Sequence, residues 1–216
     1  MSLFDALLMI HITGGFTSLI VGLYIMFAKK GTKQHKAVGK IYFFAMITAA
    51  LVALPMSYLH PNVFLFLISI FTIYMLLTGT RYLKKKTLQD VNILDWTLTV
   101  TMLLFAGSFI IFSVFYITKG DSFTIVYLVF GGIGFLFSFQ DWKNFSGRSQ
   151  IKNFFLTTHI QRMTGSYIAS VTAFLVVNNT ILPSAVAWLL PTAILTPFIV
   201  KWVRKYKVKS KEVAIQ

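Results

Sequence analysis

Histidine supplies the most versatile side chains of this sequence, and three histidines lie in or beside long apolar segments. His11 lies about eight residues into the first such segment, and His35 and His159 each open a later one. Imidazole titrates near neutrality and is a common ligand of haem iron and of zinc. The three histidines are therefore the first candidates for redox, acid–base or metal chemistry.

The turns that follow His35 and His159 supply small, aromatic and sulfur-containing residues. A glycine such as Gly165 leaves room for a flat macrocycle, and Arg162 lies one turn beyond His159, deeper than a snorkelling side chain easily reaches. In the alternative interpretation, His35 and His159 are boundary residues of basic loops. The predicted cofactor-binding residues are His11, His35, His159, Gly39, Tyr42, Arg162, Met163 and Tyr167.

His11 precedes a stripe of small residues on one helical face. Gly15, Ser18 and Gly22 follow it at i+4, i+7 and i+11. Such a stripe lets a neighbouring helix approach closely, with the histidine forming an interhelical hydrogen bond, or else it faces a flat cofactor. The sequence leaves both interpretations open.

Asp95 and Asp141 each lie next to a tryptophan at the end of an apolar segment. Each carboxylate could orient a histidine or neutralise a lysine, although an Asp–Trp pair is also typical of an interfacial anchor. Zinc catalysis needs three protein ligands and an open position. The predicted metal set is therefore His35, His159 and Asp141.

The segments that must position these residues are long and apolar. The 216-residue chain is 56% hydrophobic and 12% charged, whereas soluble domains carry about 25% charged residues. Runs of about 18 to 24 apolar residues can cross a bilayer, and lipid requires them to be helical. Seven spans are predicted: Leu3–Ala28, Val38–Leu59, Asn62–Leu83, Ile93–Ile117, Ser122–Gln140, Leu156–Val177 and Ala185–Val203.

Lysine and arginine are concentrated in alternate connections between the predicted spans, and therefore on one side of the membrane. Of the 20 basic residues, Lys119 alone lies in an even-numbered connection, whereas the odd-numbered connections and the tail are basic. Short loops rich in Lys and Arg stay in the cytoplasm, which predicts an all-α membrane protein with its N-terminus outside and its C-terminus inside. We expect one transmembrane domain over residues 1–205, a basic cytoplasmic tail over 206–216, and location in a prokaryotic inner membrane.

The formal net charge of +14 follows from this topology and does not indicate nucleic-acid binding. The basic face should attract anionic lipid headgroups. The chain has no cysteine, which excludes disulfides, iron–sulfur clusters and thiolate chemistry. It also has no H-E-x-x-H, G-x-S-x-G, phosphate-loop or C-x-x-C-H motif.

Seven spans allow a 3+1+3 pseudo-repeat of two parallel triplets joined by an inverting fourth helix. His35 and His159 each open the second helix of a triplet, and Pro61 or Pro183 begins the third. A pseudo-two-fold axis along the membrane normal would make the two histidines symmetry mates.

Three motifs together give the chain a resemblance to a known family. They are His11 with Gly14-Gly15 and Gly22, then His35-x-x-x-Gly39-Lys40-x-Tyr42, and His159-x-x-Arg162-Met163-x-x-x-Tyr167. The chain resembles a family of polytopic prokaryotic and fungal membrane proteins known only as domain of unknown function 2306. The resemblance implies that the three histidines belong together, and it implies no reaction. In the family pattern Trp stands at Arg162 and Arg at Gly165, which puts a role for charge at that turn in doubt.

Three functions fit these residues. The first, which we prefer on the sequence, is a haem- or metal-binding redox protein, since a b-type haem needs two imidazoles at similar depth, such as His35 and His159. The second is a carrier or binding protein for a small solute or lipid, because the SWEET sugar transporters also have a 3+1+3 arrangement. The third is a zinc-dependent hydrolase at the cytoplasmic face. The sequence identifies no substrate, so enzymatic activity stays open.

Overall fold

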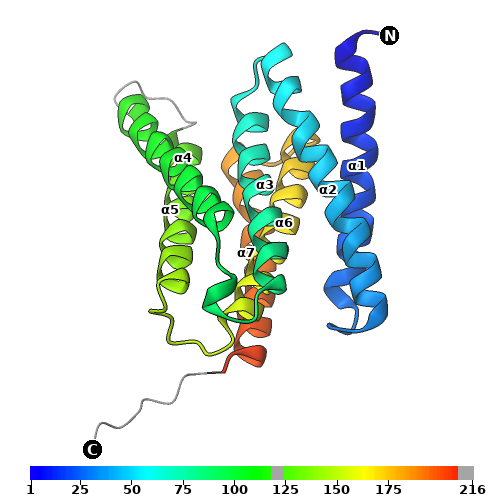
Figure 1. Ribbon diagram of the computed structural model, residues 1–216. Helices are drawn as coiled ribbons and strands as arrows, with labels where there is room; N and C mark the ends of the chain where they lie inside the picture. Colours follow the sequence, from blue (N-terminus) through cyan, green and yellow to red (C-terminus); the bar gives the residue numbers. More distant parts are fainter. Residues whose placement is uncertain (118–123, 209–216) are drawn as a thin grey trace, which may run out of the picture. The chain divides into compact units, whose positions relative to one another are not determined.

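The computed structural model describes residues 1–117 and 124–208, which form seven long α-helices, one short 3-10 helix and no β-strand (Figure 1). The 3-10 helix is η1, Leu88–Asp90. The α-helices are α1 Leu3–Phe27, α2 Lys33–Leu59, α3 Val63–Lys84, α4 Ile93–Ile117, α5 Thr124–Phe145, α6 Phe154–Val177 and α7 Ser184–Tyr206.

Six of these helices are long and apolar enough to cross a membrane. They are α1 to α5 and α7, and their number and composition are those of an integral membrane protein. The prediction of an all-α membrane protein is therefore confirmed. Among the helices of the described residues, α6 alone does not reach this hydropathy, because it carries many polar side chains.

The helices extend beyond several predicted spans. α2 begins at Lys33 rather than Val38, because Thr32 caps it: the His35 backbone N–H donates to the Thr32 hydroxyl at 3.1 Å. α5 continues to Phe145 rather than Gln140. The predicted connection Thr118–Asp121 with Lys119, the predicted span start at Ser122, and Lys209 and Lys211 of the tail lie outside the described residues.

The chain divides into two compact units. The first contains residues 1–79 and 160–203, which are α1, α2 and most of α3, α6 and α7. The second contains residues 80–159 and the chain from Arg204 onward, with α4, α5 and the adjoining ends of α3 and α6.

In the first unit, α1 and α2 lie side by side through a stripe of small residues (Figure 1). A Cβ atom at Gly14 would lie 2.8 Å from the carbonyl oxygen of Ala45. Ser18 is fully buried, and its hydroxyl lies 3.2 Å from the sulfur of Met46. Gly15, which the sequence analysis placed in the stripe, has no atom within 4 Å of the Cβ position, so Gly14 takes its place.

In the second unit, α4 and α5 pack against each other in the same way. A Cβ atom at Gly131 of α5 would lie 3.0 Å from the carbonyl oxygen of Ala106 on α4. Ala106, Met102 and Phe109 of α4 are buried. Glycine thus permits close backbone approach in both units, as is common between membrane helices.

The α1–α2 contact makes a direct prediction for Gly14. We expect Gly14→Val to lower the free energy of unfolding by about 1–3 kcal/mol, because the added side chain meets a backbone carbonyl that cannot rotate away. Thermal unfolding of the detergent-purified protein measures the effect. The neighbouring Gly15→Val is the control and should change little, since its Cβ enters open space. Equal losses in both variants would contradict the packing described above.

Candidate functional site

The polar face of α6 is turned into the protein. Its buried polar residues are Thr157, Thr158, Arg162, Thr164, Ser166, Ser170 and Thr172. Hydrocarbon cannot satisfy such groups, so a helix of this composition must be covered by other helices. α6 is therefore the element on which a functional site inside this protein would be built.

In the first unit, α6 meets α2 through a buried hydroxyl pair. The Tyr42 and Ser166 side-chain oxygens lie 2.8 Å apart, and the Ser166 hydroxyl also donates to the Met163 carbonyl at 2.8 Å. The ring of Tyr167 lies 6.4 Å from that of Tyr42, centroid to centroid. The structure thus brings together three residues that the sequence predicted for one site: Tyr42, Met163 and Tyr167.

Apolar side chains surround this pair. We call the buried set of Met26, Tyr42, Met46, Leu76 and Tyr167 the tyrosine cluster. A Cβ atom at Gly22 of α1 would lie 3.0 Å from the Tyr42 ring and closer still to the Tyr167 ring. Two hydroxyl-bearing rings therefore occupy the space that Gly22 leaves open.

Arg162 lies on α6 one turn before Ser166 and is 0% exposed. Its guanidinium carbon lies 5.2 Å from the centroid of the Tyr74 ring, within the range of a cation–π interaction. A Cβ atom at Gly79 would lie 2.9 Å from the Arg162 Cβ, so α3 and α6 approach closely at this turn. Arg162 is thus fully enclosed by protein, and an ionisable group so placed in a membrane protein is a functional candidate. Its depth in the membrane stays a prediction.

His11 forms the interhelical hydrogen bond that the sequence offered as one of two interpretations. Its Nδ1 lies 2.9 Å from the carbonyl oxygen of Ala49, which accepts the hydrogen bond across the α1–α2 contact. The stripe that follows His11 is filled by side chains and backbone of α2 and α6. His11 therefore links α1 to α2 through its Nδ1, and its predicted role in cofactor binding stays a prediction.

The space predicted for a macrocycle is not found beside Gly165. A Cβ atom there would lie 2.9 Å from the sulfur of Met75, so a side chain of α3 fills this position. Gly39 faces open space with no atom within 4 Å, and it does not line the tyrosine cluster. His35 belongs to the first unit and His159 to the second, and their shared site stays a prediction.

The second unit contains its own buried polar network. Tyr82 donates a hydrogen bond to the Asp141 carboxylate at 2.8 Å, and the Asn144 side-chain amide lies 3.2 Å from the Tyr82 hydroxyl and 3.3 Å from that of Thr158. Asp141 is 0% exposed. It is therefore a buried hydrogen-bond acceptor within the second unit.

Aromatic rings enclose this network within the second unit. Phe145 stacks on Tyr82 at 5.3 Å between centroids, and Phe154 meets the same ring edge-on at 6.4 Å. In residues 1–117 and 124–208, no group of three or more His, Cys, Asp or Glu side chains is arranged to hold a metal ion. The set of His35, His159 and Asp141 thus receives no support and stays a prediction.

Asp95 neutralises two cations at the start of α4. Its carboxylate lies 2.6 Å from the Arg81 Nε and 2.7 Å from the Lys85 Nζ, and it also accepts a hydrogen bond from the Asn92 backbone at 3.0 Å. The side chains of Asp95 and Lys85 are 3% and 4% exposed. Of the roles that the sequence left open for Asp95, charge neutralisation is the one the structure shows.

Sequence reasoning missed Tyr74 and Tyr82, which contact Arg162 and Asp141 respectively. A signal for them exists: Tyr74, Thr78 and Tyr82 follow one another at four-residue steps and share one face of α3. All three are buried. Polar residues at helical spacing in an apolar segment would have indicated an inward face.

Comparison with known proteins does not assign this chain to a family. No family model, curated protein or solved structure matches this chain. The resemblance to domain of unknown function 2306 is neither supported nor contradicted and stays a prediction.

The Asp95 cluster predicts a strong effect on stability. We expect Asp95→Asn to lower the free energy of unfolding by about 3 kcal/mol, because a buried cation then loses its counter-charge. Denaturant or thermal unfolding in detergent measures the loss. Asp90→Asn is the matched control: Asp90 is exposed and bonds only to the backbone and hydroxyl of its own loop, so its change should be small. Equal effects of the two substitutions would disprove the charge-neutralising role of Asp95.

Proposed function

We propose that this chain is a seven-span carrier for a small polar solute, with its site on the inward polar face of α6. The observation that carries the proposal is the complete burial of Arg162 on a part of α6 in the first unit that also turns Ser166 and Ser170 inward. Charges and hydroxyls in a membrane interior are expensive, and in carriers they mark the path or binding site of a polar solute. Tyr42 and Tyr167 contribute further hydroxyls at the same level of the first unit.

Helix-interrupting prolines favour a carrier over a rigid scaffold. Pro55 lies inside α2, and Pro191 and Pro197 lie inside α7. Each proline removes one helical hydrogen bond and frees a backbone carbonyl. Membrane proteins tolerate such breaks where helices bend or line a path.

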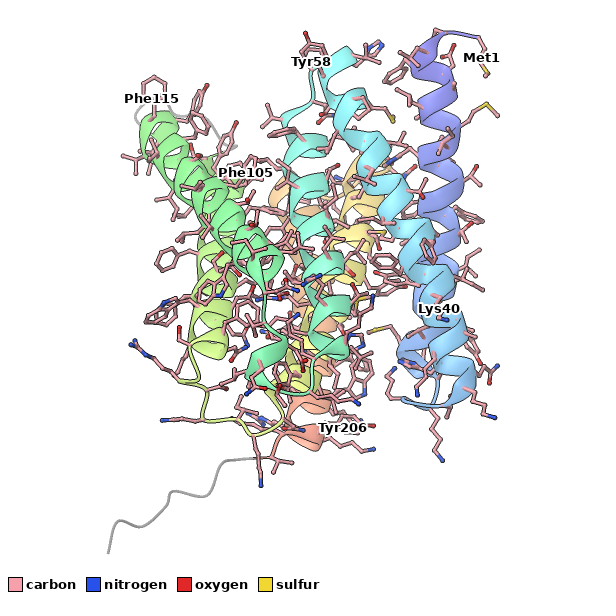
Figure 2. The ribbon with its side chains drawn as sticks, in the orientation of Figure 1. Met1, Lys40, Tyr58, Phe105, Phe115 and Tyr206 are labelled. Atoms are coloured by element: carbon pink, nitrogen blue, oxygen red, sulfur yellow. The ribbon has the colours of Figure 1, made fainter. Side chains whose placement is uncertain are left out.

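The proposed topology has α6 as a seventh span, the N-terminus outside and the C-terminus inside, in a prokaryotic cytoplasmic membrane. Figure 2 shows Met1 and Tyr58 near one end of α1 and α2, whereas Lys40 lies toward the other end. The second end also has Lys29, Lys30, Lys33 and Lys36. Short basic connections stay in the cytoplasm, where this end would face anionic lipid headgroups.

The redox alternative keeps His35 and His159 as predicted ligands, and the hydrolase alternative adds Asp141. For the redox alternative, protein atoms fill the space at Gly22 and Gly165 where a flat cofactor was expected. For the hydrolase, no observation brings the three predicted ligands together. A carrier needs no resident cofactor. The polar face of α6 therefore supports transport best, and family membership in domain of unknown function 2306 is compatible with it.

Reporter fusions test the topology. We expect green fluorescent protein fused after Gln216 to fluoresce, and alkaline phosphatase inserted after Pro61 or Asn179 to be active, because the first stays inside and the other two are exported. Inactive phosphatase after Asn179 would mean that α6 does not cross. An active phosphatase at the C-terminus would overturn the orientation.

Ligand-dependent stability tests the carrier. We expect at least one of glucose, alanine, succinate and glycerol 3-phosphate to raise the melting temperature of the detergent-purified protein, since a solute at a hundredfold excess over Kd stabilises by about 2.7 kcal/mol. The same solute should exchange in proteoliposome counterflow. Ser166→Ala and Arg162→Met should abolish both effects, whereas Ser138→Ala, a buried serine of the second unit that bonds only its own helix, should retain them.

The same preparation separates the alternatives. A Soret band, or stoichiometric iron or zinc by mass spectrometry, would favour the redox or hydrolase reading. A colourless, metal-free protein that neither responds to nor exchanges any of the four solutes would disprove the carrier as proposed.

A further inference from the structure

α7 covers the tyrosine cluster through one narrow stripe. Its inward residues are Ala187, Pro191, Leu195, Phe198 and Trp202, at steps of three or four. Of these, Leu195, Phe198 and Trp202 pack against the cluster that contains Tyr42 and Tyr167. These three side chains are only partly buried. The covering segment therefore makes limited contact with the cluster beneath it.

Two prolines weaken the helix where this segment begins and within it. Pro191 leaves the carbonyl of Ala187 without its helical donor, and Pro197 does the same for Ala193. The covering residues Leu195, Phe198 and Trp202 all lie beyond Pro191. The segment is thus joined to the first turns of α7 by a stretch that bends more easily than a regular helix.

A lysine fastens the far end of the segment to α1. The Lys30 ammonium donates to the carbonyls of Ile25 and Met26, the latter at 2.8 Å, and lies 4.3 Å from the centroid of the Trp202 ring. These carbonyls belong to the last turn of α1, which has no basic residue of its own, so Lys30 supplies the positive charge that a helix C-terminus favours. Burial lowers the pKa of Lys30 to about 8, so its ammonium is still charged at neutral pH.

We propose that the segment Pro191–Trp202 is a hinged gate over the tyrosine cluster and that Lys30 is the latch that holds it closed. The gate rests on the proposed carrier function, in which it would admit solute to Tyr42 and Ser166 from the basic end of the first unit. Release of Lys30 from Trp202 frees the segment to swing at Pro191 and Pro197. The hydroxyl pair beneath it then becomes accessible to water.

The absence of cysteine from the chain allows a direct test. Ser166→Cys places a single thiol under the gate, and its reaction with N-ethylmaleimide is followed by mass spectrometry in proteoliposomes. Adding Lys30→Gln should raise the labelling rate about threefold or more, the effect of losing one cation–π contact at a partly exposed site. Pro197→Ala should lower the rate in both backgrounds, because it restores a helical hydrogen bond at the hinge.

Two controls separate gating from general loosening. Lys29→Gln removes the same charge from the exposed neighbouring lysine and should leave the rate unchanged. Ala53→Cys places a thiol at a buried position on α2 that is 1% exposed and lies outside the tyrosine cluster. Its labelling rate should not respond to Lys30→Gln. If Ser166→Cys does not fold, Met46→Cys reports on the same cluster.

The gate is disproved if Lys30→Gln and Lys29→Gln change the labelling rate of Ser166→Cys equally. It is also disproved if Lys30→Gln raises the labelling rate of Ala53→Cys as much as that of Ser166→Cys. The labelling rate needs no solute, so a failed solute screen leaves this test intact. Conversely, solute exchange without any effect of Lys30 would keep the carrier and remove the gate.

Discussion

Hydrocarbon offers no hydrogen-bond partner, so a polar side chain inside a membrane protein must find its partner within the protein. This requirement falls mainly on α6, since a charged group and several hydroxyls face inward along its length. In each unit, α6 finds hydrogen-bond partners on the helices of that unit. Ser166 pairs with Tyr42 in the first unit, and Thr158 receives the Asn144 amide in the second. The neighbouring helices can stay largely apolar because a few of their polar side chains supply these hydrogen bonds to α6.

Glycine sets the distances at which those groups meet. At Gly14 and Gly131 a backbone carbonyl of the neighbouring helix lies 2.8 and 3.0 Å from where a Cβ atom would stand, and at Gly22 two tyrosine rings fill the space. Dispersion between closely packed backbones is a principal source of helix association in lipid, where apolar burial gives no advantage. The same close packing that stabilises the helices also fixes where the Tyr42 and Tyr167 hydroxyls lie.

The buried charges are placed differently from the hydroxyls. Asp95 and Lys85 form an ion pair near the ends of α3 and α4, where a short connection brings them together. Arg162 and Asp141 are both fully buried within their helices, against Tyr74 and Tyr82 of α3. Aromatic residues of one helix thus accompany both charges, which reduces the cost of desolvation by supplying a ring face or a hydroxyl.

The sequence by itself determined the elements, because membrane helices follow from long apolar runs and each forms its backbone hydrogen bonds within itself. It therefore predicted the all-α membrane class, and it named Tyr42, Met163 and Tyr167 together, which the structure brings close to one another. It placed Gly15 in the stripe of α1, whereas Gly14 makes the contact, because the position of Ala45 on α2 decides between two glycines that lie close to one helical face. Likewise, the hydrogen bond of His11 to the Ala49 carbonyl and that of Tyr82 to Asp141 join residues distant in the chain. Those contacts arise from packing between helices, which a pattern along one helix does not encode.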